Sequence, residues 1–244
     1  MDTIQNPQSL PAPRSSWQAG EIHNPVVVIP AYNAAKTIRP LIRHVKQLAL
    51  DPVVVNDGST DDTVQVATEA GALVISHLQN QGKGAALRTG FAFALQAGYD
   101  AVVTMDSDGQ HDPQEIPYLL DVASLPQAAV VVGHRLVDGW CMPCLRRWTN
   151  RLMSLIVSRL ARQRIPDSQC GFRVIRRQVL SAIQLSTSRF DLETELLLAA
   201  TRRGWRVISV PIRTIYPHHT SSIHPVWDGL RFVHVVLRHL LHPR

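Results

Sequence analysis

Two aspartates separated by one residue stand at the end of an apolar segment. Asp106 and Asp108 follow residues 101–105, which are Ala, Val, Val, Thr and Met. In an extended chain, residues i and i+2 lie on the same side, so both carboxylates can reach one hard divalent cation. Such a cation would bridge the phosphates of a diphosphate. The alternative for an isolated Asp-x-Asp pair is an acidic turn without a metal, because Asp favours such junctions.

Polar residues also follow the first two apolar segments. Pro30 and Tyr32 come at the end of the first segment, where their rings could form a flat apolar wall. Asp57 comes at the end of the second segment and can accept hydrogen bonds from a base or a ribose. We expect these residues, with Asn33 and Asn56, to bracket a nucleoside. An ordinary turn followed by a capped helix is the alternative for the second group.

A glycine-containing loop opens the third helical segment. Gly82 and Gly84 flank Lys83 in the run Asn-Gln-Gly-Lys-Gly-Ala-Ala. Glycine lets a backbone approach a ligand closely, and Lys83 adds a positive charge that suits phosphate. The run lacks the spacing G-x-x-x-x-G-K-[ST] of an NTPase phosphate loop, so an NTPase is disfavoured. Ordinary turn residues are the alternative for the two glycines.

The elements that must position these residues alternate along residues 26–132. Short β-branched segments, typical of strands, alternate with stretches of helical periodicity. Short connections between them predict an α/β fold with a mostly parallel sheet flanked by helices, and a ligand site at the carboxyl ends of the strands. The expected strands are residues 26–29, 53–55, 73–75, 101–105 and 129–132. The expected helices are residues 34–48, 61–70, 83–97 and 113–124.

The pattern changes after residue 133. Helices are expected at residues 145–165, 192–203 and 225–241, and strands at residues 170–177 and 207–210. We expect a flexible tail over residues 1–24 and one domain over residues 25–244. Within this domain, we expect residues 25–133 to bind a metal and a substrate that donates a chemical group, and residues 134–244 to bind the substrate that accepts it. We call these parts the donor half and the acceptor-side half.

The charge of the chain changes sign near residue 133. The net charge is +6, but residues 1–133 hold 7 Lys and Arg against 13 Asp and Glu, whereas residues 134–244 hold 18 against 6. An acidic half suited to a metal is therefore followed by an arginine-rich half suited to phosphate or an anionic surface. No recognised nucleic-acid-binding module accompanies the arginines, so nucleic acid is not expected as a partner.

Membrane and redox signals are sparse. No segment approaches the ~18 apolar residues of a membrane span and no signal-peptide pattern begins the chain, so we expect a cytoplasmic protein. Cys141, Cys144 and Cys170 form no zinc pattern and are expected to be free thiols. The predicted helix at residues 225–241 has an apolar stripe beside basic residues. It could lie on an anionic membrane surface or pack against the sheet.

Seven short motifs occur in an order typical of one enzyme family. They are V-I-P-A-Y-N, V-N-D-G-S-T-D-D-T, N-Q-G-K-G-A-A, M-D-S-D-G-Q-H-D-P, V-G-H-R, D-S-Q-C-G-F-R and L-E-T-E. The chain thereby resembles family 2 of the inverting nucleotide-sugar glycosyltransferases, and within it the dolichyl- or polyprenyl-phosphate mannose synthases. The resemblance implies a GT-A fold, Mg²⁺ or Mn²⁺, a nucleotide-diphosphate sugar such as GDP-mannose or UDP-hexose, and a polyprenyl phosphate at the inner face of the membrane.

The resemblance assigns roles to the residues that match its motifs. The catalytic candidates are Asp106, Asp108, Arg135, Glu193 and Glu195. The donor-nucleotide candidates are Pro30, Tyr32, Asn33, Asn56, Asp57, Gly82, Lys83, Asp106 and Ser107, and the metal candidates are Asp106, Asp108 and Gln110. The acceptor-phosphate candidates are Arg135, Arg147, Asn150 and Arg173. Several guanidinium groups together would neutralise a lipid phosphate.

The acceptor decides whether a general base is needed. A phosphate is already anionic at neutral pH, whereas a sugar or lipid hydroxyl must lose a proton during transfer. For a hydroxyl acceptor, Glu193, Glu195 or Asp191 would be the base. Glu193 and Glu195 do not share one face of the expected helix, so they cannot act as a simple pair. A more distant alternative is a Mg²⁺-dependent phosphohydrolase similar to haloacid dehalogenases, with Asp106 phosphorylated and Asp108 as the acid–base group.

Overall fold

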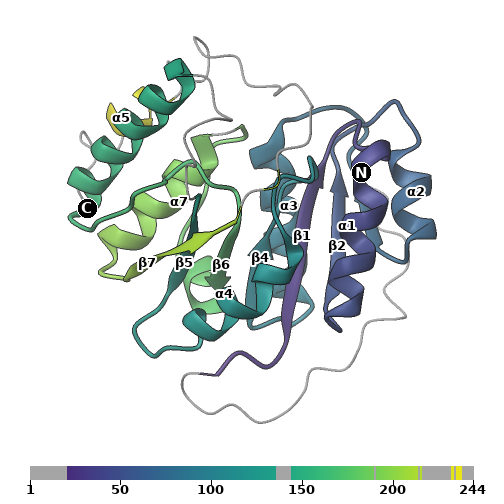
Figure 1. The fold of residues 1–244 in the computed structure, drawn as a ribbon, viewed down its shortest axis with the longest axis horizontal. Helices are drawn as coiled ribbons and strands as arrows, with labels where there is room; N and C mark the ends of the chain where they lie inside the picture. Colours follow the sequence, from purple (N-terminus) through teal and green to yellow (C-terminus); the bar gives the residue numbers. More distant parts are fainter. Residues whose placement is uncertain are drawn as a thin grey trace.

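One seven-stranded sheet organises the part of the chain that the computed structural model describes. That part comprises residues 21–135, 144–189, 191–213, 215, 232–233 and 235–237, without the side chains of residues 144–147. The strands are β1 (Pro25–Ala31), β2 (Asp51–Asn56), β3 (Leu73–Ser76), β4 (Ala101–Thr104), β5 (Val130–Arg135), β6 (Arg173–Arg176) and β7 (Val207–Ile212). Their order across the sheet is β3-β2-β1-β4-β6-β5-β7. Neighbouring strands are parallel except where β6 meets β4 and β5, so the predicted mostly parallel sheet is confirmed (Figure 1).

Helices cover both faces of this sheet (Figure 1). They are α1 (Ala35–Gln47), α2 (Thr63–Glu69), α3 (Lys83–Gln96), α4 (Ile116–Ala123), α5 (Cys144–Ala161), α6 (Arg177–Ala182) and α7 (Asp191–Arg202), with a 3₁₀ turn at Pro113–Glu115. α1 packs against α2 and β2, whereas α3 packs on β1 and β2 and contacts α6 and α7. None of the helices in the described ranges combines the length and the apolar composition needed to span a bilayer.

Apolar runs and helical periodicity explain these elements. β1 and β2 are buried almost throughout, as is typical of interior strands of a parallel sheet. α1 buries Ile38, Leu41, Ile42 and Val45, which recur at three- and four-residue spacing. Fully burying one such side chain contributes about 1.5–3 kcal/mol, so one face of α1 is fixed on the sheet.

The carboxyl ends of β1, β2, β4 and β5 share one edge of the sheet, because these four strands run in the same direction. The antiparallel β6 begins at this edge. α3 also begins here, since its first residue contacts the segment that follows β4. Polar residues that are far apart in the sequence therefore meet at this carboxyl edge, as predicted from the strand pattern.

Some predicted boundaries differ from the structure. The predicted helix over residues 113–124 is divided into the 3₁₀ turn and α4, each with a proline in its first turn. The predicted strand over residues 170–177 becomes β6 followed at once by α6, a helix that was not predicted. Of the predicted helix at residues 225–241, the structure describes residues 232–233 and 235–237, which are helical.

The end of the predicted tail is attached to the domain. Asp100 Oδ2 accepts the backbone N–H groups of His23 at 2.6 Å and Asn24 at 2.9 Å. Residues 1–20 lie outside the described part of the chain. The same holds for Cys141 and for the side chain of Cys144, whereas Cys170 is a free thiol whose pKa is raised by burial to about 12.

Gly90 of α3 lies against Val28 of β1. A Cβ atom at residue 90 would come within 2.3 Å of Val28 Cγ1. We expect Gly90→Ala to lower the free energy of unfolding, because overpacking costs about 1–3 kcal/mol and exceeds the ~1 kcal/mol by which alanine favours a helix. Urea unfolding measures the change, with Gln96→Ala at an exposed position of α3 as the control. A Gly90→Ala protein as stable as the parent would contradict this packing.

Candidate active site

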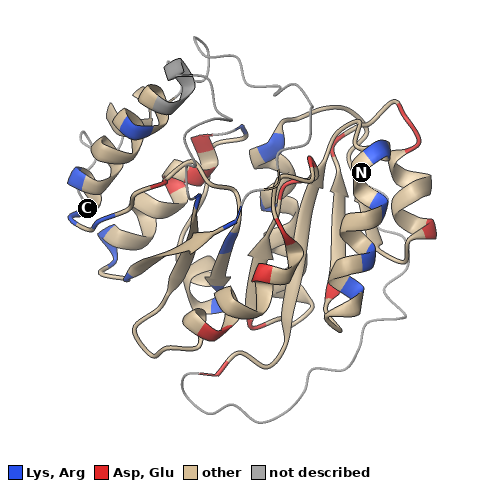
Figure 2. Cartoon of the chain, viewed as in Figure 1, with Lys and Arg blue, Asp and Glu red and all other residues tan. Residues whose placement is uncertain are grey.

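Three charged side chains from distant parts of the chain meet at the carboxyl edge. Lys83 Nζ lies 2.6 Å from Asp106 Oδ1 and 3.0 Å from Glu193 Oε1. Lys83 begins α3, Asp106 follows β4, and Glu193 lies in the first turn of α7. Figure 2 shows basic and acidic positions meeting at this edge. We call these three residues the charge cluster.

Electrostatics fixes the charges within this cluster. Burial alone would raise the pKa of Asp106, but the ammonium of Lys83 and the nearby ring of His111 hold it well below its usual range. Burial also opposes the charge of Lys83, yet Asp106 and Glu193 raise its pKa above the usual range. The cluster therefore holds an ammonium group against the Asp106 carboxylate at neutral pH. Such a buried pair persists because its partners neutralise each other.

Gly171 and His111 lie against the carboxylate of Asp106. A Cβ atom at Gly171 would lie 2.6 Å from Asp106 Oδ1, so residue 171 must be a glycine for this approach. His111 is buried, with its ring centroid 5.2 Å from that of Phe172 and its Nε2 3.7 Å from Asp106 Oδ2. Its Nδ1 has no hydrogen-bond partner within the described residues. His111 was not among the predicted site residues, although it stands in the same motif as the two aspartates.

The second aspartate of the pair has a different environment. Asp108 is exposed, and its Oδ1 accepts the backbone N–H of Gln110 at 2.9 Å. Ser107 is anchored between the aspartates, because its carbonyl oxygen accepts a hydrogen bond from Thr37 Oγ1 at 2.6 Å. One carboxylate is thus enclosed and paired, while the other is open to solvent.

The two aspartates fit a cation that a substrate helps to bind. Within the described ranges, no group of three or more His, Cys, Asp and Glu side chains could hold a metal ion by itself. Mg²⁺ is commonly held by one or two carboxylates together with substrate phosphates, and Asp106 and Asp108 could supply that part. In the structure, Lys83 supplies the positive charge beside Asp106.

The loop after β1 places Tyr32 at the surface and Pro30 in the core. Tyr32 is half exposed, whereas Pro30 is buried within β1, so the predicted wall of two rings is not formed. The proline fits because the β1–β4 ladder ends before it, so its missing N–H deprives no neighbouring strand. Asn33 has φ of 52°, and its Oδ1 accepts the backbone N–H of Thr60 at 2.8 Å. Asn33 therefore joins the loops that follow β1 and β2.

The predicted nucleoside residue Asp57 also holds a neighbouring loop in place. Its buried carboxylate lies 2.8 Å from His77 Nδ1 and accepts the backbone N–H groups of Gln81 at 2.9 Å and Gly82 at 2.7 Å. A carboxylate has about four acceptor positions, so these contacts inside the protein use most of them. Asn56 is buried and accepts an N–H from the turn after β2, so its role is in that turn. His77 was not predicted, because nothing in its local sequence indicates a partner 20 residues away.

The chain itself occupies the space expected for a ligand at the start of α3. A Cβ atom would lie 2.6 Å from Ser188 O at Gly82 and 2.5 Å from Arg189 O at Gly84. The backbone N–H of Ala85 donates to Ser188 O at 2.8 Å. These glycines permit close approach of the chain's own backbone. The predicted role of Gly82 beside a phosphate stays a prediction.

Two of the predicted acceptor arginines are engaged inside the protein. Arg173 is 2% exposed, and its guanidinium donates to three backbone carbonyl oxygens, on the loop before β6 and on α7. Its guanidinium therefore holds the backbone in this structure, and its predicted contact with a phosphate stays a prediction. Arg135 is also buried and donates to both carboxylate oxygens of Asp167, at 2.7 and 2.9 Å. Burial opposes the ionisation of Asp167, but Arg135 holds its pKa below the usual range.

The other two acceptor candidates lie on α5. Asn150 is half-buried, and the side chain of Arg147 lies outside the described part of the structure. Asp167 was not predicted, although it begins the D-S-Q-C-G-F-R motif.

The three candidate bases at the start of α7 have separate roles. Glu195 accepts hydrogen bonds from the backbone N–H and the hydroxyl of both Ser186 and Thr187. Burial opposes its ionisation, but these bonds hold the pKa of Glu195 below its usual range. Asp191 Oδ1 accepts the N–H of Arg189 at 3.1 Å. Only Glu193 of the three joins the charge cluster, whereas Glu195 holds the preceding loop. The predicted catalytic role of Glu195 stays a prediction.

Comparison with known proteins decides the family. The sequence model described as Glycosyl transferase family 2 matches residues 26–184. The chain belongs to glycosyl transferase family 2. This match begins in β1, includes both aspartates and ends after α6, so Glu193 lies beyond it. The predicted glycosyltransferase is confirmed, and the phosphohydrolase alternative is removed.

Similar proteins in this family carry lipid-related names. The chain is 30% identical over 219 residues to UDP-N-acetylglucosamine–dolichyl-phosphate N-acetylglucosaminyltransferase of Methanococcus voltae, covering 80% of this chain and 87% of that one. It is 31% identical over 204 residues to polyprenol monophosphomannose synthase of Mycolicibacterium smegmatis, covering 77% and 76%. Glucosyl-3-phosphoglycerate synthase of Mycobacterium tuberculosis, solved with UDP, shares the fold. Its TM-score is 0.73 at 22% identity, and the match covers 96% of this chain and 88% of that one. The predicted GT-A fold is thereby confirmed.

The charge cluster makes stability depend on Lys83. We expect Lys83→Met to lower the free energy of unfolding by about 3–5 kcal/mol at pH 7, because two buried carboxyl groups lose their cation. Since the pKa of Asp106 is held low, its contribution in the parent is present at neutral pH and is lost as pH falls below its usual pKa. Without Lys83, burial favours the protonated form of Asp106, whose pKa it raises. The difference between the two proteins should therefore be smaller at about pH 4 than at pH 7.

Urea unfolding at several pH values measures this difference. Lys36→Met, at an exposed position of α1, is the matched control. If Lys83→Met lowered the free energy of unfolding only as much as the control does, or by an amount that does not change with pH, the result would count against the charge cluster.

Proposed function

We propose that the protein transfers a hexosyl group, with inversion, from a nucleotide-diphosphate sugar to a polyprenyl phosphate, in the presence of Mg²⁺ or Mn²⁺. The observation that carries this proposal is the enclosed Asp106 beside the exposed Asp108 at the carboxyl edge. The names of the two relatives include a dolichyl phosphate and a polyprenol, which supports a lipid phosphate as the acceptor. The reaction would take place where that lipid lies, at the cytoplasmic face of the membrane.

The donor side follows from the loops at the carboxyl edge. Tyr32 offers an exposed ring for a base, and Asp57 stays the proposed acceptor for a base or ribose donor. Asp106 and Asp108, with Gln110, would hold a divalent cation, which would stabilise negative charge on the departing diphosphate. Lys83 lies 2.6 Å from Asp106 and would add a positive charge on the same side.

The state of the α7 carboxylates favours a phosphate acceptor over a hydroxyl. Glu193 is paired with Lys83, Glu195 is saturated by a loop, and Asp191 accepts a backbone N–H. A phosphate monoester needs none of them as a base, because its second ionisation lies near pH 6. One of its oxygens attacks the anomeric carbon, the bond from that carbon to the diphosphate breaks, and the nucleoside diphosphate leaves with the electron pair.

The acceptor side would then use α5. Arg147 and Asn150 remain the proposed contacts of the acceptor phosphate, since the guanidinium of Arg173 is committed to backbone carbonyls. Arg135 would act mainly by fixing Asp167 and the loop that leads to β6.

A product assay tests the reaction. We expect a mass increase of one hexosyl unit on short-chain polyprenyl phosphate when GDP- and UDP-sugars are screened with Mg²⁺ or Mn²⁺. Asp108→Asn should lose most of this activity and keep the parent's unfolding curve, because Asp108 is exposed. Asp121→Asn, exposed on α4, is the matched control. Transfer to sugar hydroxyls alone, or full activity of Asp108→Asn, would overturn the proposal.

The acceptor type predicts how substitutions on α7 behave. With polyprenyl phosphate and saturating donor, Glu193→Gln, Glu195→Gln and Asp191→Asn should each lower kcat by less than the 10²–10⁴-fold expected for a lost general base. Rates are compared at equal folded fraction, because Glu195→Gln weakens a loop. A loss of that size in one folded variant, with disappearance of the acidic limb of its pH profile, would instead indicate a base and a hydroxyl acceptor.

A further inference from the structure

We infer that one face of α5 docks on the surface of an anionic phospholipid bilayer. The face consists of Trp148, Arg151, Leu152, Leu155 and Arg159, and we call it the α5 outer face. The inference rests on the proposed function, because it names the surface that would bring the active site to a lipid-borne acceptor.

The spacing of these residues places them on one side of the helix. They recur at intervals of three and four positions, which project in one direction from an α-helix. Trp148, Leu152 and Leu155 are 70%, 59% and 54% exposed, and Arg151 and Arg159 are also exposed. Among the described residues up to 133, the exposed large apolar side chains are spread along the sequence, at residues 32, 64, 73, 78, 118 and 125, and scattered exposed apolar residues are ordinary for a protein surface. Three in one helical row form a patch, and such patches mark interaction sites.

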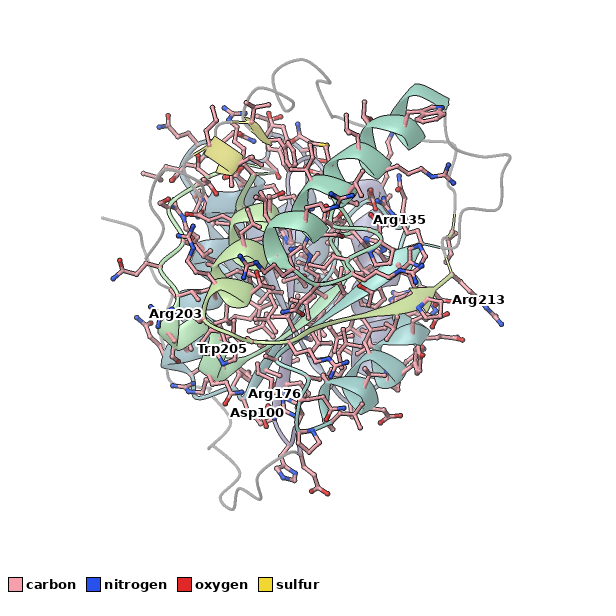
Figure 3. All side chains as sticks on the ribbon, turned by 90° about the vertical axis from the view of Figure 1, so that its left-hand side faces the viewer. Asp100, Arg135, Arg176, Arg203, Trp205 and Arg213 are labelled. Carbon is pink, nitrogen blue, oxygen red and sulfur yellow. The ribbon has the colours of Figure 1, made fainter. Side chains whose placement is uncertain are left out.

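The opposite side of α5 is fixed to the domain. Ser154, Val157 and Ala161 are buried there. Ser154 Oγ accepts the backbone N–H of Ser168 at 3.0 Å, on the loop that leads to the charge cluster. Figure 3 shows α5 lying across the front of the molecule in that view. The outer face therefore points away from the sheet, while the inner side is connected to the active site.

The positive charge around the α5 outer face favours an anionic partner. Residues 144–166 contain no Asp or Glu, and Figure 2 shows basic but no acidic positions on α5. Gln163, just past the helix, hydrogen-bonds at 2.9 Å to the backbone at both ends of the turn over residues 205–207. Arg206 lies between these two backbone contacts and Arg203 shortly before them, and both are exposed, so positive charge continues in the segment held by Gln163. Figure 3 labels Arg203 and Trp205 in this segment.

An apolar row flanked by arginines matches the boundary between lipid headgroups and acyl chains. Trp and Leu side chains enter the apolar side of that boundary, while guanidinium groups reach lipid phosphates. α5 has 18 residues, so it is about 27 Å long and could lie flat along the surface. Its four arginines exclude a transmembrane orientation.

Vesicle binding tests the inference without using the transfer reaction. The full chain is sedimented with phosphatidylcholine vesicles that contain or lack phosphatidylglycerol. We expect binding to the anionic vesicles that weakens with salt. Arg151→Gln and Arg159→Gln should each reduce it about fivefold, and Leu152→Ser with Leu155→Ser should reduce it at least about tenfold. Quenching of tryptophan fluorescence by brominated lipid should be lower in Trp148→Phe than in the parent.

Matched controls and a separate assay keep the outcomes distinct. Arg43→Gln on α1 and Leu125→Ser after α4 change exposed residues elsewhere and should leave binding unchanged. Binding that survives the α5 substitutions, or no binding by the parent, would overturn the inference. The molecular mass of the protein in solution is measured by light scattering. If the leucine substitutions lowered this mass and left vesicle binding unchanged, the α5 outer face would join two protein copies, and the inference would be overturned. Transfer to a water-soluble short-chain acceptor should be unaffected by these substitutions, so its absence in the parent would count against the proposed function alone.

Discussion

One ammonium group connects the parts of the chain that form the active site. Lys83 is the first residue of α3 and contacts Asp106 after β4 and Glu193 on α7. All three groups are largely buried, so each depends on the others for a counter-charge. The position of α7 relative to the sheet is thereby coupled to the position of the Asp106–Asp108 loop. The contact between Lys83 and Glu193 thereby links residues 25–133 to residues 134–244.

Carboxylates hold the surrounding loops in place by accepting hydrogen bonds. Asp57 accepts backbone N–H groups at the start of α3, and Glu195 does the same for the loop before α7. Asp167 accepts the guanidinium of Arg135 on β5. Charge-assisted hydrogen bonds of this kind are stronger than neutral ones. They fix the loop backbones around the site through buried or half-buried charged groups.

The sequence predicted features that depend on neighbouring residues, but not those that depend on contacts between residues far apart in the chain. Strands and helices up to residue 132 follow from local periodicity, and so does the placement of Asp106 and Asp108 at a strand end. The roles of Arg173 and Glu195 depend on distant backbone groups. Residue type alone does not show whether a charged side chain faces a ligand or satisfies the interior. The close contact of Gly82 with residues 188–189 could not be predicted for the same reason. A glycine indicates that another group approaches closely, but it does not identify that group.

The reversed strand β6 has a consequence for the order of folding. β6 is hydrogen-bonded on both sides, to β4 and to β5, so its pairing is complete only when both are present. Strands β1 to β4 come from one continuous stretch of chain, whereas Lys83 and Glu193 are 110 residues apart. Contacts between distant residues form late, because loop-closure entropy must be overcome before they contribute. During synthesis, a chain with its first four strands in place would therefore present Asp106 and Lys83 to solvent, without Glu193 and without the cover that β6 and its preceding loop provide.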